Sequence, residues 1–411
     1  MAPGHLTPHV YESLVDLGTW MPFAKAAQEL KRLLGVTISE PTARRYAEGA
    51  GAAYEGVQSA EVVRIEKMLP EAPAGPAKQL LSVDGAMVPL VGGEWAEVKT
   101  LVLGEIQAPV KKKGQVAVHT AALSYFSRLT DATTFGRLAL VETHRRGVEN
   151  ARLVAAVTDG AEWEQGFIDF HRPDAVRILD FAHAAEHLSA VGEAIWGQGT
   201  PATAQWFEQQ LAALKQQGPG PMLAELHALQ QTHPSLDVLT GTLAYLEKRQ
   251  KQIQYPDYLA QGLPIGSGAV ESGNKLVVEA RLKGAGMHWA RSHVNPMLAL
   301  RNIACNDRWT EAWPAIVAHA HDQAAQRQRQ RRQQRPPLPH PLPAIAAQHP
   351  PAVPAPALAI PLPSASTGSP PCPATTKPPA LPHRPAANHP WRCSPIGKAI
   401  YQSSSKTTAK N

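Results

Sequence analysis

The sequence predicts an α/β protein in which a mixed β-sheet follows an N-terminal helical region and is interrupted by a helical insertion. Apolar runs typical of strands alternate with segments of helical period between residues 79 and 189. Residues 10–56 carry apolar side chains at helical spacing, and twenty of the 38 prolines lie between Pro336 and Pro395. Strands mixed with helices in this order favour a mixed sheet, followed by a tail without regular structure.

The charge of the chain is unevenly distributed. Its 411 residues, 44% of them hydrophobic, are enough for two or three packed domains. Eleven of the 40 basic residues but only one of the 34 acidic residues lie from residue 321 onward, so 1–320 has net charge −4 and the rest +10. We therefore expect 326–411 to be a disordered, basic, proline-rich tail.

Several classes of protein are disfavoured by composition. No window of about 18 apolar residues could cross a membrane, and the N-terminus lacks the pattern of a secretory signal. Three distant cysteines, Cys305, Cys372 and Cys393, form neither a disulfide framework nor a CxxC zinc motif. We expect a cytoplasmic protein that makes no membrane contact.

The N-terminal region has the outline of a helix-turn-helix. One helix follows Pro22 and ends near Gly35, and Ser39 can cap the next. This second helix carries Arg44 and Arg45, which are candidates to contact DNA. A plain helical hairpin explains the same pattern equally well.

Strand patterns begin after the linker composition of residues 72–78. The runs 79–90 and 93–106 flank a Gly92-Gly93 turn that suits a hairpin. A third strand is expected within 116–129 and a helix within 134–151. Two further apolar strands end on Asp159 and Asp180, and helices follow to about residue 252.

Acidic residues stand where an α/β sheet usually places its ligand site. Asp84 and Asp159 each follow a strongly apolar strand, at what we expect to be its carboxyl end. Glu271 is expected in the first turn of a late helix, which begins within the glycine-rich segment PIGSGAVESG. Turn formation by the two aspartates, and a dipole-complementing role for the glutamate, remain alternatives. Three converging carboxylates would suit two Mg²⁺ ions, or Mn²⁺ in their place, in phosphoryl transfer.

At these residues the chain resembles the ISKra-type transposases of bacterial insertion sequences, which are distantly related to Mutator-like transposases. The matching stretches include LSVDGAMVPLVGGEWAEVKTLVLGE, VETHRRGVENARLVAAVTDGAEWEQGFIDFHRPDAVRILDFAHAAEHL and PIGSGAVESGNKLVVEARLKGAGMHWA. Together with the later NPMLALRNIACNDRW, they cover roughly residues 80–310. The resemblance implies an RNase H-like catalytic core with an Asp-Asp-Glu triad.

Carried onto this sequence, the resemblance implies that Asp84, Asp159 and Glu271 form the triad and hold the metal ions. Asp180 and His183 match a D-x-x-H signature, for which we expect a supporting role around the metal; a buried packing pair is the alternative. Trp196 and Trp206 fall in the expected helical insertion, where stacking on an unpaired base is less expected than a place in the core. The expected organisation is a DNA-binding region over 1–72, a core over 79–189 and 261–325, an insertion over 190–260, and the tail over 326–411.

The function that the resemblance implies is DNA transposition. The protein would bind the terminal inverted repeats of its own element, cleave there, and transfer the freed 3′ hydroxyl to target DNA. It would act beside the nucleoid as a homo-oligomer that holds two ends together. Lys275 and Arg281, near the third carboxylate, are candidates to contact phosphate. A structure-specific nuclease on the same fold is one alternative. A shortened, inactive DNA-binding remnant is another, because longer members of the group carry a cysteine-rich N-terminal segment.

Overall fold

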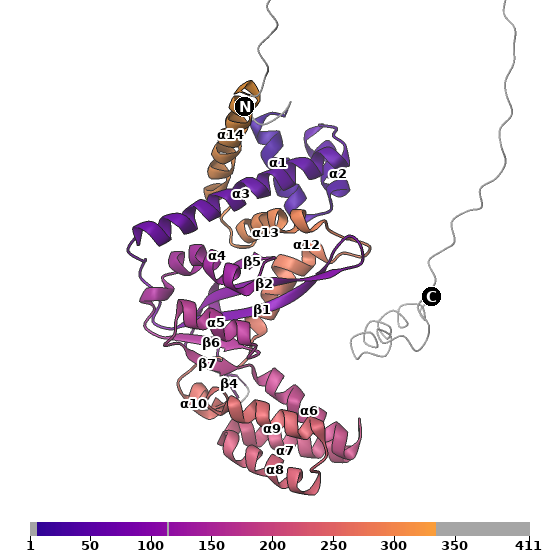
Figure 1. Ribbon diagram of the computed structural model, residues 1–411, viewed down its shortest axis with the longest axis vertical. Coiled ribbons are helices and arrows are strands. Elements are labelled where there is room, and N and C mark those ends of the chain that lie inside the picture. The colour runs from indigo at the N-terminus through magenta and orange to yellow at the C-terminus, as the bar shows by residue number, and fades with distance from the viewer. Residues whose placement is uncertain (1–5, 113–114, 334–411) are drawn as a thin grey trace, which may run out of the picture. The chain divides into compact units, whose positions relative to one another are not determined.

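The computed structural model describes residues 6–112 and 115–333 and contains a mixed five-stranded sheet (Figure 1). The strand order is β5-β2-β1-β6-β7. Strands β1, β2 and β5 pair antiparallel, whereas β6 and β7 run parallel to β1. The strands are β1 Gln79–Pro89, β2 Trp95–Ile106, β5 Thr120–Arg128, β6 Val154–Thr158 and β7 Val176–Leu179. A separate two-stranded sheet consists of β3 Val110–Lys112 and β4 Gln115–Ala117.

The predicted hairpin is confirmed, and its first strand, β1, ends one residue before the end of the predicted run 79–90. Gly92 and Gly93 have φ angles of 97° and 85°, a backbone region that glycine adopts without a steric cost. Pro89 therefore pairs with Trp95, and β1 and β2 pair along the whole of β1. Asp84 thus lies in the middle of β1 and pairs with Thr100, not at the end of its strand as predicted.

Helices cover both faces of the sheet. Helices α4 Ala132–Arg145 and α5 Glu162–His171 pack on one face, where Leu81, Val83 and Phe126 are buried. On the other face, residues of β1 and β2 such as Val88 and Val102 contact α13 Arg291–Cys305 and the segment before it. The helices that follow β7 pack against β6 and β7 and form a separate hydrophobic cluster with them.

The N-terminal region is helical, as predicted. It comprises α1 Pro8–Trp20, α2 Phe23–Leu34 and α3 Glu40–Met68. Gly35 ends α2 in the left-handed conformation, and the Ser39 side chain accepts a hydrogen bond from the Thr42 amide at the start of α3. Helix α3 packs on α13 so closely that a Cβ atom on Gly51 would lie 2.0 Å from the Pro296 carbonyl oxygen. This contact explains why α3 needs a glycine there.

Helices occupy the segment expected as an insertion. They are α6 Phe181–Trp196, α7 Pro201–Gln217, α8 Pro219–Thr232, α9 Asp237–Lys248, the 3-10 turn η2 Gln250–Gln252 and α10 Tyr255–Ala260. Trp206 is 7% exposed and contacts Trp196 with 5.2 Å between ring centroids. These rings belong to the core of the insertion, which argues against base stacking by Trp206.

The last described helices return to the sheet and to the N-terminal region. They are α11 Gly268–Gly273, the π-helix η3 Asn274–Glu279, α12 Ala280–Leu282, α13, and α14 Trp309–Gln333. The predicted tail boundary at residue 326 is therefore wrong for 326–333, which continue α14. Residues 334–411 of the predicted tail lie outside the described residues.

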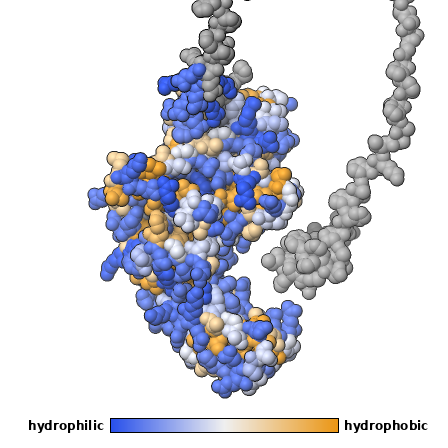
Figure 2. Space-filling view, viewed as in Figure 1, coloured by the Kyte–Doolittle hydropathy of each residue, from blue (hydrophilic) through white to orange (hydrophobic). Residues whose placement is uncertain are grey.

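Within residues 6–112 and 115–333, every helix is too short or too polar to cross a bilayer. Hydrophilic residues cover most of the face seen in Figure 2. A hydrophobic patch at its left edge lies over the C-terminal end of α3, where Met68 and Leu69 are 69% and 80% exposed.

Candidate functional site

Two of the predicted acidic residues meet beside the sheet. Strands β1 and β6 pair in parallel as far as Leu81 and Ala156. Asp84 and Asp159 each follow three residues later, so the strand register brings them to the same level on adjacent strands. Together with Glu164 of α5 they form a carboxylate cluster, in which one oxygen atom of each residue lies within 4.8 Å of the others. Such a group of hard oxygen ligands can hold a divalent cation.

Glu164 was not among the predicted site residues. It is 1% exposed, and its Oε2 accepts hydrogen bonds from the amides of Gly160 (3.0 Å) and Ala161 (3.1 Å). Burial, a hydrogen bond with Asp159 and the negative charge of Asp159 raise its pKa to about 10. In the metal-free site the Glu164 carboxyl group therefore carries a proton at neutral pH, and that proton reduces the repulsion between the two side chains.

Asp84 is held from two directions. Its Oδ1 accepts a hydrogen bond from the Gly85 amide (2.6 Å), and its Oδ2 accepts one from Asn274 Nδ2 (2.8 Å). Desolvation is the main reason that its pKa is raised to about 6, and the charges of Asp159 and Glu271 add to the shift. The site thus concentrates negative charge in a partly buried place, where a cation would be stabilised.

Glu271, the third predicted ligand, is near this cluster but is not part of it. Its side chain is exposed on α11, and its Oε1 accepts a hydrogen bond from the Ser267 hydroxyl group (3.2 Å). Its charge acts on Asp84. Asn274, three residues later, contacts Asp84 directly. The structure therefore brings the Glu271 segment to the site but places Glu164, not Glu271, with the two aspartates.

Asp180 connects this segment to the sheet. Its Oδ2 accepts a hydrogen bond from the His183 amide (3.2 Å) at the start of α6, and its Oδ1 accepts one from the Ser267 amide (3.0 Å) before α11. The carboxylate is buried, so these two bonds compensate its desolvation. The predicted pairing of Asp180 with His183 thus involves the His183 backbone. The His183 ring lies 3.5 Å from Glu186 and contacts the ring of His187.

Side chains of the insertion hold the turn that carries Asp159. The Tyr245 hydroxyl group donates a hydrogen bond to the Asp159 carbonyl oxygen, and Arg249 donates one to the Gly160 carbonyl oxygen, both at 2.6 Å. The Tyr245 ring stacks on His187 (4.2 Å between centroids), and the Arg249 guanidinium lies 3.8 Å from the Tyr245 centroid. Two consecutive carbonyl groups of the turn are thereby fixed from the C-terminal end of α9 and the residue that follows it.

The four basic residues expected to contact DNA differ in their placement. Arg44 and Arg45 are exposed on α3, and Lys275 is exposed on η3. Arg281 is only 2% exposed: it donates a hydrogen bond to the Gly18 carbonyl oxygen (3.0 Å) and lies over the rings of Phe23 and Trp289. The expectation for Arg281 is therefore corrected, because a buried guanidinium with these partners holds helices together and cannot reach a phosphate.

The sequence did contain one signal for Glu164. It stands in the first turn of the helix that follows Asp159-Gly160, where a glutamate often accepts hydrogen bonds from amides at the helix start. No comparable local signal pointed to Tyr245 or Arg249, which lie 86 and 89 residues from their hydrogen-bond partners.

Comparisons with known proteins do not assign the chain to a family. A scan against protein-family models matched none, and a search of curated proteins found no similar sequence. The carboxylate cluster and its supports are accordingly the basis for assigning a function.

Proposed function

We propose that the protein is a DNA transposase that cleaves and joins phosphodiester bonds at the carboxylate cluster with the help of divalent cations. The observation that carries the proposal is the meeting of Asp84 and Asp159 on adjacent strands, with the Glu271 segment docked beside them through Asn274. The resemblance to insertion-sequence transposases implies a triad drawn from these same three parts of the chain.

The sheet supports an RNase H-like assignment for the core. Three antiparallel strands are extended by two parallel ones, and helices lie on both faces. The acidic residues come from the central strand β1 and from the end of its parallel neighbour β6. The carboxyl end of a parallel strand, where Asp159 lies, is the position at which open α/β sheets bind their ligands.

The donor set fits Mg²⁺ or Mn²⁺. All candidate ligands are carboxylates, and desolvation together with mutual repulsion raises the pKa of Asp84 to about 6. A pair of divalent cations, when bound, would supply activation of the attacking oxygen and stabilisation of the leaving one. In this proposal Asp84 and Asp159 hold the cations, and Glu271 contributes the third carboxylate from α11.

The other residues of the site would keep these ligands in place. Asn274 orients Asp84, and Asp180 ties the start of α11 to the sheet. Glu164 fixes the amides of the turn after Asp159. A buried position and a proton suit Glu164 to shaping the turn, which leaves the two aspartates as the principal ligands.

DNA binding is proposed for the exposed arginines of α3. Arg44 and Arg45 can contact phosphates, a charge-driven interaction that weakens as salt increases. The net negative charge of residues 1–320 does not oppose this role, because cations bound at the carboxylate cluster would offset part of it.

The test is a cleavage and joining assay with the full chain. The substrates are DNA carrying the sequences that flank the gene, a supercoiled target plasmid, and Mg²⁺ or Mn²⁺. We expect joined products from the wild type, none from Asp84→Asn, and wild-type yield from Asp237→Asn, which removes an exposed charge on α9. Nicks without joining would instead indicate a nuclease. If the wild type and Asp84→Asn both bind the flanking DNA but produce neither nicks nor joined products, the protein would be a DNA-binding remnant.

A further inference from the structure

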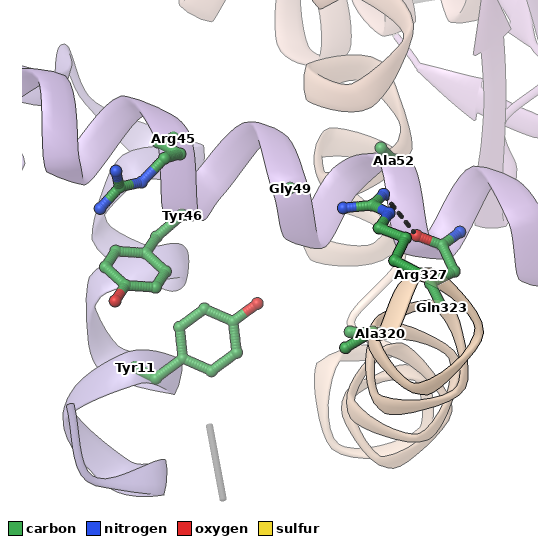
Figure 3. A pocket seen from close by; sticks show the side chains of 9 residues that line it. Tyr11, Arg45, Tyr46, Gly49, Ala52, Ala320, Gln323 and Arg327 are labelled. Carbon is green, nitrogen blue, oxygen red and sulfur yellow. Dashed lines mark hydrogen bonds between the residues drawn. The ribbon is translucent and has the colours of Figure 1, made fainter. Parts of the chain in front are cut away.

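A groove of about 420 Å³ lies between the N-terminal helices and α14, and no residue of the carboxylate cluster lines it. Tyr11 of α1 and Tyr46 of α3 form one end, and Arg327 of α14 lies at the other (Figure 3). Small residues of α3 and α14, among them Ala52 and Ala320, line the space between them. We call this the α3–α14 groove.

The walls of the groove are held in a defined position. The ring of Trp313 on α14 contacts the buried Tyr11 with 5.2 Å between centroids, and Trp309 donates a hydrogen bond to Glu12 of α1 (3.2 Å). A Cβ atom on Gly56 of α3 would lie 2.3 Å from the His319 ring, so α3 and α14 approach closely there. The groove is therefore bounded by packed helices.

The groove is positively charged. The Arg45 guanidinium lies 5.5 Å from the centroid of the Tyr46 ring, and Arg327 donates a hydrogen bond to the neutral Gln323 (3.4 Å). Within the described part of the chain, neither arginine forms an ion pair, and no acidic residue lines the groove. Two uncompensated guanidinium groups at its two ends suit a ligand that carries repeated negative charges.

We propose that the α3–α14 groove binds the sugar-phosphate backbone of one DNA strand. Arg45 and Arg327 would each contact a phosphate, while the small residues between them leave room for deoxyribose. The proposal rests on the proposed function for its DNA partner, and it adds a second helix, α14, to the binding surface. It also assigns Arg45 to a backbone contact, which positions the protein without reading the sequence.

A DNA strand is favoured over an acidic peptide because the positive charge continues beyond the groove. Between His321 and Gln333, α14 contains one acidic residue, Asp322, and Arg327, Arg329, Arg331 and Arg332 follow it. A duplex extends farther than the groove and can use such charges, whereas a short peptide would be recognised mainly by the groove itself.

The test measures the salt dependence of binding between the full chain and a labelled duplex of arbitrary sequence. Each phosphate contact adds about 0.9 to the slope of log K against log salt concentration. We expect Arg45→Gln and Arg327→Gln each to lower the slope by about 0.9, and the double variant by about twice that. When salt is raised from 50 to 200 mM, the fold loss of affinity of each single variant should be about three times smaller than that of the wild type.

Arg329→Gln is the matched control. It removes the same charge from the same helix, but two residues from Arg327 the side chain points to a different side, and it does not line the groove. An equal loss of slope for Arg329→Gln would overturn the proposal in favour of diffuse attraction by the basic helix. Unchanged slopes for Arg45→Gln and Arg327→Gln would also overturn it.

Competition distinguishes the remaining outcomes. Displacement of the duplex by an acidic peptide at lower concentration than by unlabelled DNA would make the groove a peptide site and overturn the proposal.

A wild type that binds no duplex even at low salt would contradict the proposed function itself. A wild type that binds its flanking DNA but whose groove variants bind it equally well contradicts only the groove. Thermal unfolding of each variant confirms that the fold is retained.

Discussion

The hydroxyl group of Tyr245 donates a hydrogen bond of 2.6 Å to the carbonyl oxygen of Asp159, across 86 residues of sequence. Arg249, one helical turn later, binds the next carbonyl oxygen, that of Gly160. The insertion is therefore fastened to the turn that presents one of the candidate metal ligands. A change in the position of α9 would therefore displace the turn that carries Asp159.

Replacing Tyr245 by phenylalanine should weaken metal binding. The change removes one hydrogen bond to the Asp159 turn but keeps the ring that stacks on His187. Loss of a bond that orients a ligand is expected to reduce Mn²⁺ affinity about 3- to 10-fold. Calorimetric titration of the metal-free protein with Mn²⁺ measures this. Lys248→Met is the control, since it breaks an exposed ion pair between α9 and Glu162 without touching the turn; equal affinities in both variants would contradict the prediction.

The stability of the metal-free protein should fall as pH rises, because of Glu164. Its pKa is near its ordinary value in the unfolded chain and about 10 in the folded one. Between these values the folded state holds one more proton than the unfolded state, so this group lowers the free energy of unfolding by about 1.4 kcal/mol per pH unit. Denaturant unfolding at pH 6, 7 and 8 in the presence of a chelator measures the slope.

Glu164→Gln provides the comparison for that experiment. Glutamine keeps the shape and can still accept hydrogen bonds from the Gly160 and Ala161 amides, but it does not titrate. The free energy of unfolding of this variant should therefore fall less with pH, by the contribution of about one proton, which is about 1.4 kcal/mol per pH unit. Identical slopes in the two proteins would show that Glu164 is ionised in the metal-free fold.

Asp180→Ala should destabilise the protein more than the loss of a helix cap does. Its carboxylate caps α6 and also binds the Ser267 amide, and it is 6% exposed. We expect a loss of about 2–4 kcal/mol. Asp131→Ala removes an exposed cap, which accepts hydrogen bonds from the Thr134 amide and the Thr130 hydroxyl group, and should cost about 1 kcal/mol. Chemical denaturation compares the two, and equal losses would mean that the bond to Ser267 contributes nothing.

Arg281→Ala should reduce stability without changing the salt dependence of DNA binding. The buried side chain bridges α12 to α1 and α2 through Gly18 and Phe23, so its removal should cost about 2–4 kcal/mol. Arg44→Ala, on the exposed face of α3, should change stability by less than about 0.5 kcal/mol. A lower salt slope for folded Arg281→Ala would restore Arg281 as a phosphate contact.

Much of the secondary structure could be predicted because its signals are local. The Gly92-Gly93 turn, the cap at Ser39 and the apolar runs before Asp159 and Asp180 each depend on a few neighbouring residues, and the structure confirms them. The end of α14 was missed because the composition of the tail outweighed the helical propensity of its glutamine- and arginine-rich start.

The sequence by itself determined which strands carry the acidic residues, since alternation and apolar runs mark strands wherever they stand. Only the tertiary structure decided that Asp84 and Asp159 lie level on adjacent strands, that Glu164 joins them, and that Arg281 is buried. The physical reason is that a side chain's neighbours are set by packing between elements distant in sequence. Register, burial and hydrogen bonds across tens of residues leave no mark in a local pattern.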